Sequence, residues 1–521
     1  MLATLLSATL VALDGRVIRV EVDVAPGLPG FTIVGLGDAS IREARERVRG
    51  ALRNAGFVHP PRRITVNLAP ADVPKTGSAA DLAIAIGILI GSEQFTARAG
   101  RAALIGEVSL GGEIRPVPGL LPMVAALARR GVRRVIVPAD GADEARLVEG
   151  LEIVAAATVA EAVDALRSRR RAGPTQPARV ELAPTAGTSL TRIPLSLAPP
   201  LSPPDLADVR GQIEARRALE VALAGGHGLL MIGPPGTGKT MLARTIPALL
   251  PPLSDEQSLA ATIVASVSGE GPLHALVRTP PFRAPHHTSS YAAIVGGGRG
   301  PSPGEVTRAD GGVLFLDELT EFSRDVLEAL RQPLEDGRVS IARASGTATL
   351  PARFQLVAAT NPCPCGHAGD EDRCVCGQGV PERYVGRISG PLRDRIDVWV
   401  TLSRMKASAM VDGPDPEPSA AVALRIAAAR ATQQARLGGK LNARVGGRAL
   451  RAIASLRPVT ARRLADLADA ERLSGRGTER LLRVARTVAD LAASAAVEIE
   501  HLEEAARWRP PSGRSPMALA V

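Results

Sequence analysis

The sequence predicts an α/β protein of several domains, and three observations support this fold class. Three apolar runs, at 229–232, 313–316 and 354–359, each end at a polar segment, as strands of a parallel sheet buried on both faces do. Segments with alternating strand and helix patterns precede them, and an Ala-, Leu- and Arg-rich helical segment follows. A chain of 521 residues also exceeds what one compact core accommodates.

The first part, residues 1–168, has the pattern of an α/β or α+β domain. Asp38 is placed to cap a helix that continues through Leu52. The next part, residues 169–204, is rich in Pro, Arg, Ser and Thr without periodicity, which predicts a linker. Strand patterns in the first part occur at 17–24, 63–68 and 134–137.

The composition argues against several classes of protein. No stretch of eighteen apolar residues offers a membrane span, and the apolar N-terminus has no basic leader, so we expect neither a membrane protein nor a signal peptide. All four cysteines lie between positions 363 and 376, unlike a disulfide framework, which favours a reducing cytoplasm. The formal charge of +10 permits a polyanionic partner.

The segment GLLMIGPPGTGKTMLARTI combines an apolar strand, a Gly-rich loop and a helix. In such a loop backbone N–H groups wrap phosphates, the lysine (Lys239) reaches the β- and γ-oxygens and the threonine (Thr240) ligates Mg²⁺. A structural Gly-rich turn is the alternative, and the complete eight-residue pattern in this setting argues against it. The residues predicted to bind ATP are Gly233, Pro234, Pro235, Gly236, Thr237, Gly238, Lys239, Thr240 and Met241.

Two further strand ends carry polar side chains toward this loop. The second apolar run ends in Asp317 and Glu318, and the third is followed closely by Asn361. Because the carboxyl ends of parallel strands face the ligand crevice, we expect Asp317 to hold the hydrated Mg²⁺ and Glu318 to orient the attacking water. Asn361 is expected to hold that water or to sense the γ-phosphate.

Several longer motifs then indicate a family. The chain contains, in this order, PFRAPHHTSS, VGGGRGPSPGEV, GVLFLDEL, LRQPLEDGRVSIARA, NPCPCG and SGPLRDRID. Together they resemble the YifB/ComM family of magnesium-chelatase-like AAA+ ATPases over nearly the whole chain. The resemblance implies an ATP-driven, hexameric ring and, for ComM, a helicase that moves branched DNA during recombination in natural transformation. It also implies an AAA+ core at 205–402 with chelatase-type insertions, and a helical lid at 418–510.

The resemblance assigns roles to particular arginines. In SGPLRDRID, Arg395 matches the finger that reaches the ATP of the neighbouring subunit, where a fixed guanidinium contributes about 10³ or more in rate. The family usually has Leu where this chain has Arg393, which leaves Arg393 as an alternative finger. Arg476 matches the second-sensor arginine, which would bind the γ-phosphate in the same subunit, and Arg480 is its alternative one helical turn away.

Two other segments are interpreted through the same resemblance. Residues 208–212 look like the segment beside the adenine, although a turn at the start of the domain is an equally good interpretation. The insertions after Glu305 and the segment 285–288 resemble elements that face the ring pore. Adjacent side chains such as His286 and His287 point apart, and no carboxylate is spaced to match them, so a loop role or structural hydrogen bonding is expected instead of a metal site.

A cysteine cluster follows the third apolar run. Cys363, Cys365, Cys374 and Cys376 form the pattern C-x-C-x₈-C-x-C, and two pairs of thiolates can enclose a tetrahedral, structural Zn²⁺. The pairs are tighter than the common C-x₂-C arrangement, and His367 is an alternative ligand. Unligated thiols in a surface insertion, a redox disulfide or an inorganic cluster are the other interpretations.

The N-terminal domain resembles the ribosomal-S5-like fold shared with the Lon protease domain. The resemblance lies in PRRITVNLAPADVPKTGSAADLAIAIGILI and the segment GEVSLGGEIRPVPGLLPMVAALARRGVRRVIVPAD. Alignment of the protease pattern P-K-D-G-P-S-A-G on residues 74–81 places Ala79 at the nucleophile and Leu121 at the lysine base. Ser78 lies one position away and has no evident base. We therefore predict no peptidase activity, and a domain that shapes the ring or contacts DNA.

The leading hypothesis is an ATP-driven motor on branched or single-stranded DNA. Residues 421–486 hold fifteen Lys or Arg and four Asp or Glu, a charge suited to sequence-neutral phosphate contacts, although a solvated Arg-rich surface explains it equally well. With 2% aromatic residues, base stacking is not expected. One alternative is a chelatase-like motor subunit for metal insertion, against which the N-terminal fusion and the cysteine insertion argue. Another is a protein-remodelling ATPase.

Overall fold

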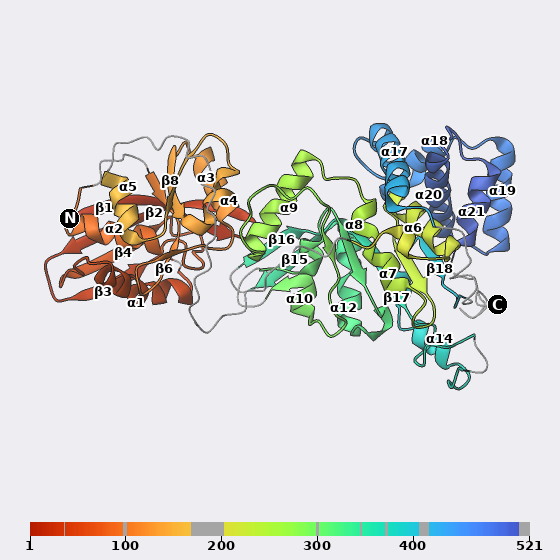
Figure 1. The fold of residues 1–521 in the computed structure, drawn as a ribbon, viewed down its shortest axis with the longest axis horizontal. Helices are drawn as coiled ribbons and strands as arrows, with labels where there is room; N and C mark the ends of the chain where they lie inside the picture. Colours follow the sequence, from red (N-terminus) through yellow and green to blue (C-terminus); the bar gives the residue numbers. More distant parts are fainter. Residues whose placement is uncertain are drawn as a thin grey trace.

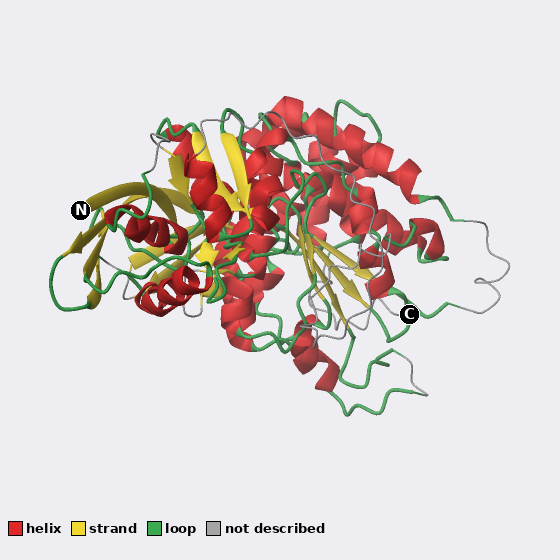
Figure 2. Cartoon of the chain, turned by 60° about the vertical axis from the view of Figure 1, so that its left-hand side comes forward, coloured by secondary structure: helices red, strands yellow, loops and turns green. Residues whose placement is uncertain are grey.

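A computed structural model of the chain describes residues 1–35, 37–96, 102–167, 203–297, 302–343, 346–369, 373–405 and 416–509. An N-terminal α/β domain, a central α/β domain and a group of C-terminal helices follow one another along the long axis of the molecule (Figure 1). Figure 2 shows the strands gathered in two separate sheets with helices packed against them. The predicted linker at 169–204 lies almost entirely outside the described residues. No described helix is long and apolar enough to cross a membrane.

The N-terminal domain is built on a seven-stranded mixed sheet of order β3-β4-β2-β1-β5-β8-β9. β1 and β2 form a long antiparallel pair, and the alternation predicted at 17–24 falls within β2, where every second side chain is buried. The predicted strands at 63–68 and 134–137 are present as β4 and β8. The strands are β1 (Leu2–Val11), β2 (Asp14–Ala25), β3 (Gly30–Val34), β4 (Arg63–Ala69), β5 (Ala102–Leu104), β8 (Arg134–Pro138) and β9 (Glu152–Ala156), and a small ribbon joins β6 (Glu107–Val108) to β7 (Ile114–Arg115).

Helices cover this sheet, and one of them is almost completely buried. The predicted cap is confirmed, because the Asp38 carboxylate accepts a hydrogen bond from the backbone N–H of Ile41 at 3.0 Å. The apolar helix α2 packs on β1 and β2 and is covered by α1 and α5. Its first residue, Asp81, is buried and pairs with Arg47 of α1 at 2.7 Å, while burial raises the pKa of Asp81 to about 6. The helices are α1 (Ala39–Asn54), α2 (Asp81–Gly91), α3 (Leu120–Arg129), α4 (Ala142–Arg146) and α5 (Val159–Arg167), with a short turn η1 (Ala139–Gly141).

The central domain contains a five-stranded sheet of order β11-β14-β17-β10-β18, in which all neighbours are parallel. The three apolar runs of the sequence form its inner strands, and every residue of those strands is buried. The third strand begins and ends one residue later than predicted. The strands are β10 (Leu229–Ile232), β11 (Phe282–Arg283), β14 (Val313–Leu316), β17 (Gln355–Thr360) and β18 (Val398–Thr401). The sequence prediction of a buried parallel sheet is thus confirmed for this domain.

Helices and small hairpins connect these strands. The hairpin β15 (Arg338–Arg343) and β16 (Gly346–Pro351) extends from the sheet after α13, and β12 (Gly296–Gly297) pairs with β13 (Ser302–Pro303). The other connecting elements are η2 (Leu206–Asp208), α6 (Ile213–Gly225), α7 (Lys239–Arg244), α8 (Ile246–Leu249), α9 (Asp255–Ser268), α10 (Tyr291–Val295), α11 (Glu305–Arg308), η3 (Leu319–Glu321), α12 (Arg324–Ala329), α13 (Arg331–Asp336), α14 (Val380–Val385) and α15 (Gly390–Arg393).

The C-terminal part is helical throughout its regular elements. α20 is its central helix: it packs against α6 of the central domain and against α17, α18 and α21. The buried apolar side chains of these helices therefore form one core with those of β10 and β18. The elements are α17 (Ser419–Leu437), η4 (Asn442–Arg444), α18 (Gly447–Ala454), α19 (Pro458–Ala470), α20 (Gly475–Leu491) and α21 (Ile499–Arg507).

The N-terminal domain meets the central domain where α3 packs against α9. The contact centres on one buried carboxylate, Glu144, which accepts hydrogen bonds from the Leu121 backbone N–H at 2.9 Å and from the Ser266 hydroxyl at 2.6 Å. The backbone N–H of Gly119 also donates to the Ser266 carbonyl at 2.9 Å. Burial raises the pKa of Glu144. A polar group thus joins the two domains at this point.

Candidate nucleotide-binding site

A Gly-rich loop joins β10 to α7 and lines a cavity of about 400 Å³. Gly236 and Gly238 adopt φ values of +78° and +89°, a left-handed conformation that glycine reaches without steric cost. The Thr237 hydroxyl donates to the Pro234 carbonyl at 2.8 Å and closes the turn. The loop therefore presents its backbone and the start of α7 to the cavity, which is the arrangement that binds phosphates.

Lys239, the first residue of α7, lies inside this loop. Its ammonium group donates to the Gly233 carbonyl at 2.6 Å, to the Pro234 carbonyl at 2.8 Å and to the Asn361 side-chain oxygen at 3.2 Å. Burial lowers the pKa of Lys239 to about 8, against the opposing effect of Asp317 and then Glu318. A phosphate oxygen would compete for the same protons and would favour the charged amine.

Thr240 and Asp317 are neighbours in the lining of the cavity. The Thr240 hydroxyl donates to Asp317 Oδ2 at 2.7 Å, and Asp317 Oδ1 accepts the backbone N–H of Glu318 at 3.0 Å. A hydroxyl and a carboxylate at this separation are the hard oxygen ligands that Mg²⁺ prefers when it also binds substrate phosphates. The residues present therefore fit the magnesium ion that the sequence predicts.

Glu318 and Asn361 complete the cavity. Glu318 adopts φ +52°, which is unusual for a residue with a side chain and concentrates at functional sites. Asn361 follows β17, the strand between β10 and β14, so it lies between the phosphate loop and the two carboxylates. The cavity lining contains the predicted residues Pro235, Gly236, Thr237, Gly238, Lys239, Thr240, Met241, Asp317, Glu318 and Asn361, while Gly233 and Pro234 contribute the carbonyls that contact Lys239.

Arg395 and Arg476 do not line this cavity; they line a second one of about 450 Å³. Gly228, which precedes β10, and Gln355, the first residue of β17, also line the second cavity, so it lies at the amino ends of strands whose carboxyl ends hold the phosphate loop. Arg395 forms an ion pair with Glu335. Burial, and next the charge of Arg476, lower the pKa of Arg395. The arginines that line the cavity are Arg395, Arg444, Arg476, Arg480 and Arg483.

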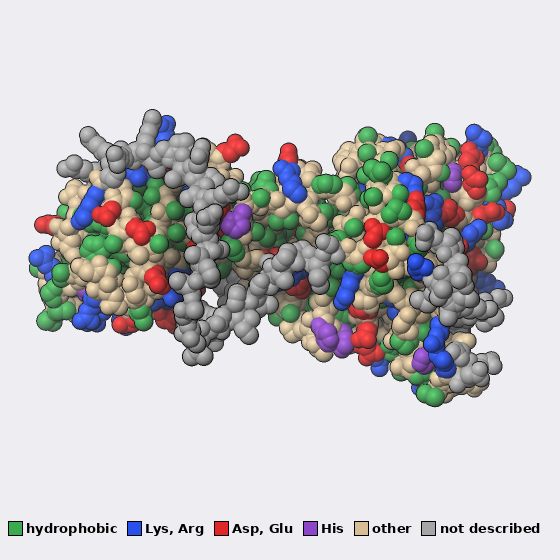
Figure 3. Space-filling view, viewed as in Figure 1, with side chains coloured by type: hydrophobic (Ala, Val, Ile, Leu, Met, Phe, Trp, Pro, Cys, Tyr) green, Lys and Arg blue, Asp and Glu red, His purple; other side chains and the backbone are tan. Residues whose placement is uncertain are grey.

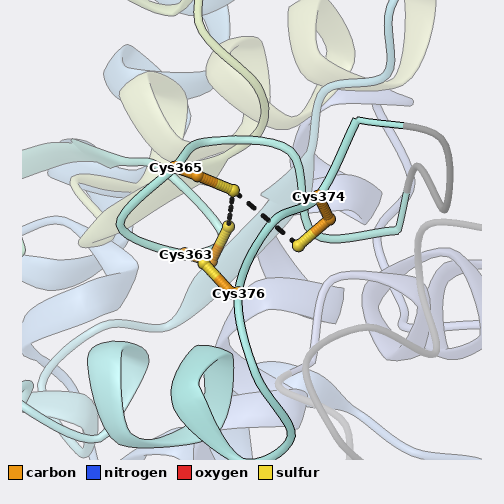
Figure 4. Close-up of side chains that lie close together, drawn as sticks. All are labelled: Cys363, Cys365, Cys374 and Cys376. Atoms are coloured by element: carbon orange, nitrogen blue, oxygen red, sulfur yellow. Dashed lines mark hydrogen bonds between the residues drawn. The ribbon is translucent and has the colours of Figure 1, made fainter.

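The four cysteines form one cluster on the segment after β17 (Figure 4). Their sulfur atoms all lie within 4.8 Å of one another, with 3.3 Å between Cys363 and Cys365 and 3.7 Å between Cys365 and Cys374. Tetrahedral Zn²⁺ with Zn–S bonds of about 2.3 Å separates its sulfur ligands by roughly 3.8 Å. The donor set and its spacing therefore fit zinc without large rearrangement, and His367 is not part of the described cluster.

Comparison with the sequences of known proteins identifies the family of this chain. Models of magnesium chelatase subunit ChlI match residues 205–410 and 20–141, and a model of its C-terminal part matches 416–509. YifB of Salmonella typhimurium is 41% identical over 499 residues, which cover 94% of each chain. Competence protein ComM of Haemophilus influenzae is 40% identical over 512 residues, covering 98% of this chain and 97% of ComM. An uncharacterized protein of Mycobacterium tuberculosis is 44% identical over 513 residues, covering 96% and 97%.

The chain belongs to the YifB/ComM family of magnesium-chelatase-like proteins. The resemblance seen in the sequence is thereby confirmed, and the parallel sheet with its phosphate loop is the chelatase-like core of this family. A model named for the chelatase subunit also matches 20–141, so the N-terminal domain, contrary to expectation, does not by itself separate YifB/ComM proteins from chelatase motors.

Within this YifB/ComM core, Arg393 contacts Trp399 and Arg480 of the same chain. Its guanidinium lies over the ring of Trp399, with 5.5 Å from Cζ to the ring centroid, and its backbone carbonyl accepts a hydrogen bond from Arg480 at 3.5 Å. Arg480 also pairs with Asp394 at 3.0 Å. Arg395 is also paired, with Glu335, but it lines the second cavity together with Arg476 and Arg480, whereas Arg393 does not.

His287 is a site residue that the sequence reasoning missed. Its Nδ1 atom lies 3.0 Å from Glu318 Oε2, and its ring lies against that of His286, with 4.2 Å between centroids. The expectations that the two histidines point apart and lack a carboxylate partner are therefore wrong, because the partner is distant in sequence. These histidines follow β11, which is the neighbour of β14 in the sheet, so the contact depends on the order of the strands and left no signal in the linear sequence.

Residues 208–212 lie beside the phosphate loop. The side-chain amide of Gln212 donates to the Thr237 carbonyl at 3.3 Å and to the Ser403 carbonyl at 2.8 Å. Met405 covers Gly211 so closely that a Cβ there would lie 2.0 Å from the Met405 sulfur. The segment thus contacts both the phosphate loop and the residues that directly follow β18.

The N-terminal domain carries the residues that the Lon comparison singled out. Ala79 and Leu121 are buried, and the Ser78 hydroxyl donates to the carboxylate of Glu107. Ser78 and Ala79 line a cavity of about 410 Å³ that Arg308 of the central domain also lines. The neighbour of the Ser78 hydroxyl is therefore a carboxylate.

The basic charge of the C-terminal helices is partly neutralised within the fold. Figure 3 shows basic and acidic side chains interspersed over this part on the visible face. Arg436 pairs with Asp490 at 2.8 Å, and Arg463 pairs with Glu503 at 2.8 Å. Exposed arginines on and beside α18 and α19 include Arg448, Arg451, Arg462 and Arg472.

Proposed function

We propose that the chain is an AAA+ ATPase whose active site is completed by a neighbouring copy in a ring. The observation that carries this proposal is the position of the two cavities at opposite ends of the same parallel strands. Head-to-tail contact would bring the arginine cavity of one copy to the nucleotide cavity of the next, and such heterologous contacts close into rings. The family implies a hexamer.

Within the nucleotide cavity, each side chain has a distinct task. Lys239 holds the β- and γ-phosphates, Thr240 and Asp317 bind the magnesium ion, and Glu318 orients the water that attacks the γ-phosphate. A magnesium ion held there would supply positive charge that neutralises the phosphate oxygens. Asn361, which contacts Lys239, reports the presence of the γ-phosphate.

Arg395 supplies positive charge to the transferring phosphate of the neighbouring copy, and Arg476 acts from the same side. This differs from the same-subunit role expected for Arg476 from the sequence. The reason is its position: Arg476 shares the cavity of Arg395 and lies at the strand ends opposite the phosphate loop.

We further propose that the motor acts on branched or single-stranded DNA in the cytoplasm, as a branch-migration helicase. Its 40% identity with a competence protein supports this substrate, as do the exposed arginines of α18 and α19, which suit electrostatic phosphate contacts. A chelatase-like motor for metal insertion and a protein-remodelling ATPase are the alternatives. The replacement of the protease residues by Ala79 and Leu121 supports a domain without peptidase activity, and peptidase activity lost in Ser78→Ala would contradict it.

The four cysteines are proposed to hold a structural Zn²⁺, because their sulfur spacing matches tetrahedral coordination. Metal analysis after chelator-free purification should give about one zinc per chain. A content near zero would overturn this part of the proposal and leave the ATPase intact.

The test of the motor is ATP hydrolysis by the purified chain with and without branched, single-stranded and duplex DNA. Glu318→Gln should retain ATP binding and lose hydrolysis, because the amide does not polarise water. Hydrolysis that no form of DNA stimulates, together with no salt-dependent DNA binding, would remove the helicase and leave the ATPase. An undiminished rate in Glu318→Gln would remove the proposed active site itself.

A further inference from the structure

The cysteine-bearing loop lies directly against the phosphate loop. Gly366, in the turn between Cys365 and the second cysteine pair, approaches Pro235 so closely that a Cβ on Gly366 would lie 2.7 Å from Pro235 Cδ. Gly366 also adopts φ +85°. The turn that carries the first two thiols therefore supports one wall of the nucleotide cavity, which Pro235 lines.

The same turn is tied to the cavity at a second point. Only Pro362 separates Cys363 from Asn361, whose side-chain oxygen accepts the Lys239 ammonium at 3.2 Å. Cys363 is buried; its sulfur accepts the backbone N–H of Ala368 at 3.2 Å, and its carbonyl accepts that of Gly366 at 2.9 Å. The first cysteine pair thus positions residues on both sides of the phosphate-binding space.

The second cysteine pair contributes nothing to the cavity directly. Neither Cys374 nor Cys376 lines it, and the thiols of the two pairs meet in several weak contacts, one of which is the 3.7 Å contact between the sulfurs of Cys365 and Cys374. A metal ion bound by all four thiolates would replace these weak contacts with four coordination bonds. Closing a loop in this way restricts its conformations and holds the turn at Gly366 against Pro235.

We propose that metal occupancy of the cysteine cluster sets the affinity of the phosphate loop for nucleotide. The inference rests on the zinc site and the ATPase proposed above, and it adds a regulatory role for that site. With the metal bound, the turn braces Pro235 and Asn361; without it, the turn moves away from Pro235 and the loop binds phosphates less tightly.

The experiment measures the affinity of the full-length chain for a fluorescent ADP, together with its zinc content. Cys374→Ser and Cys376→Ser remove ligands that do not touch the cavity. Loss of zinc in these variants should weaken ADP binding by on the order of tenfold. Circular dichroism checks that both variants fold as the wild type does.

Gly366→Ala tests the mechanical link while all four thiols remain. The new methyl group collides with Pro235, so ADP binding should weaken by about fivefold or more while zinc stays near one per chain. Gly379→Ala is the matched control, because Gly379 lies in the same insertion, has φ +73° and has no atom within 4 Å of the position that its new methyl group would take. That variant should change neither quantity.

The outcomes separate the proposals. Zinc-free variants and Gly366→Ala that bind ADP as tightly as the wild type would overturn the regulatory role. A wild-type chain without zinc would overturn the metal site and this inference with it. A zinc-loaded wild-type chain that binds no nucleotide would overturn the ATPase.

Discussion

A mixture of two inactive variants tests whether Arg395 serves the neighbouring subunit. Lys239→Ala removes the charge expected to contact the phosphates and leaves the arginine cavity intact. Arg395→Ala removes an arginine from that cavity and leaves the nucleotide cavity intact. Each variant alone is expected to lose about 10³-fold or more in the rate of ATP hydrolysis, because both charges stabilise the transferring phosphate.

The size of the expected recovery follows from the geometry. β17 runs from one cavity to the other over 6 residues, which is roughly 20 Å at about 3.3 Å per residue. An arginine side chain does not span that distance, so the proposed finger at Arg395 would have to act on the nucleotide cavity of another copy. In rings assembled from equal amounts of the two variants, an interface is productive when Arg395→Ala supplies the nucleotide cavity and Lys239→Ala supplies the arginine. Random assembly gives this arrangement at about one interface in four.

The assay is steady-state phosphate release by each variant and by the mixture after joint disassembly and reassembly. Recovery to about a quarter of the wild-type rate is expected. Mixed rings, verified by differential tags, that are no more active than either variant would refute the reasoning. The same mixture with Arg476→Ala in place of Arg395→Ala asks the same question of the second arginine, and absence of recovery would return Arg476 to its own subunit.

Three further predictions follow from the site and the N-terminal domain. Burial lowers the pKa of Lys239 to about 8, and bound phosphates favour its charged form. ADP affinity should therefore fall by up to about tenfold per pH unit as the pH rises above 8, and calorimetry in buffers of different ionisation enthalpy should detect proton uptake on binding. An ADP affinity that stays constant up to about pH 9.5 would contradict this prediction. His287→Ala should raise the basal rate of ATP hydrolysis by roughly threefold, because Glu318 no longer has to break its hydrogen bond with His287 before it orients water. A lower rate would instead show that His287 positions Glu318. Arg47→Ala leaves the buried Asp81 carboxylate unpaired and should lower the free energy of unfolding of the N-terminal domain by about 3 kcal/mol at pH 7. Amide hydrogen exchange in α2 should become faster. Unchanged exchange would mean that the ion pair contributes no net stability.

Much of the nucleotide cavity could be predicted from the sequence because its parts are local. An apolar run before GPPGTGKT fixes a strand, a loop and a helix in succession, and the rule that parallel strands share their carboxyl edge brings Asp317 and Asn361 to that loop. The helix cap at Asp38 is local in the same way.

The features that escaped the sequence depend on long-range packing. The contact of His287 with Glu318 requires the order of strands in the sheet, which a linear pattern does not contain. The side of the sheet on which Arg476 lies depends on how α20 docks against α6, and docking is decided by the shape of two buried faces. Counting charge between 421 and 486 overstated the basic surface, because partners such as Asp490 and Glu503 lie outside that segment.

The joint at Glu144 has a mechanical consequence. α9, which carries Ser266, follows α7 and α8 directly in the chain, so a displacement of the helix that begins at Lys239 is passed to α9 and from there to the N-terminal domain. Around Glu144 the attachment consists of a few hydrogen bonds, and elsewhere Ala12 and Leu13 of the N-terminal domain pack against the apolar core of the central domain. We therefore expect the N-terminal domain to change its position relative to the central domain when α7 moves.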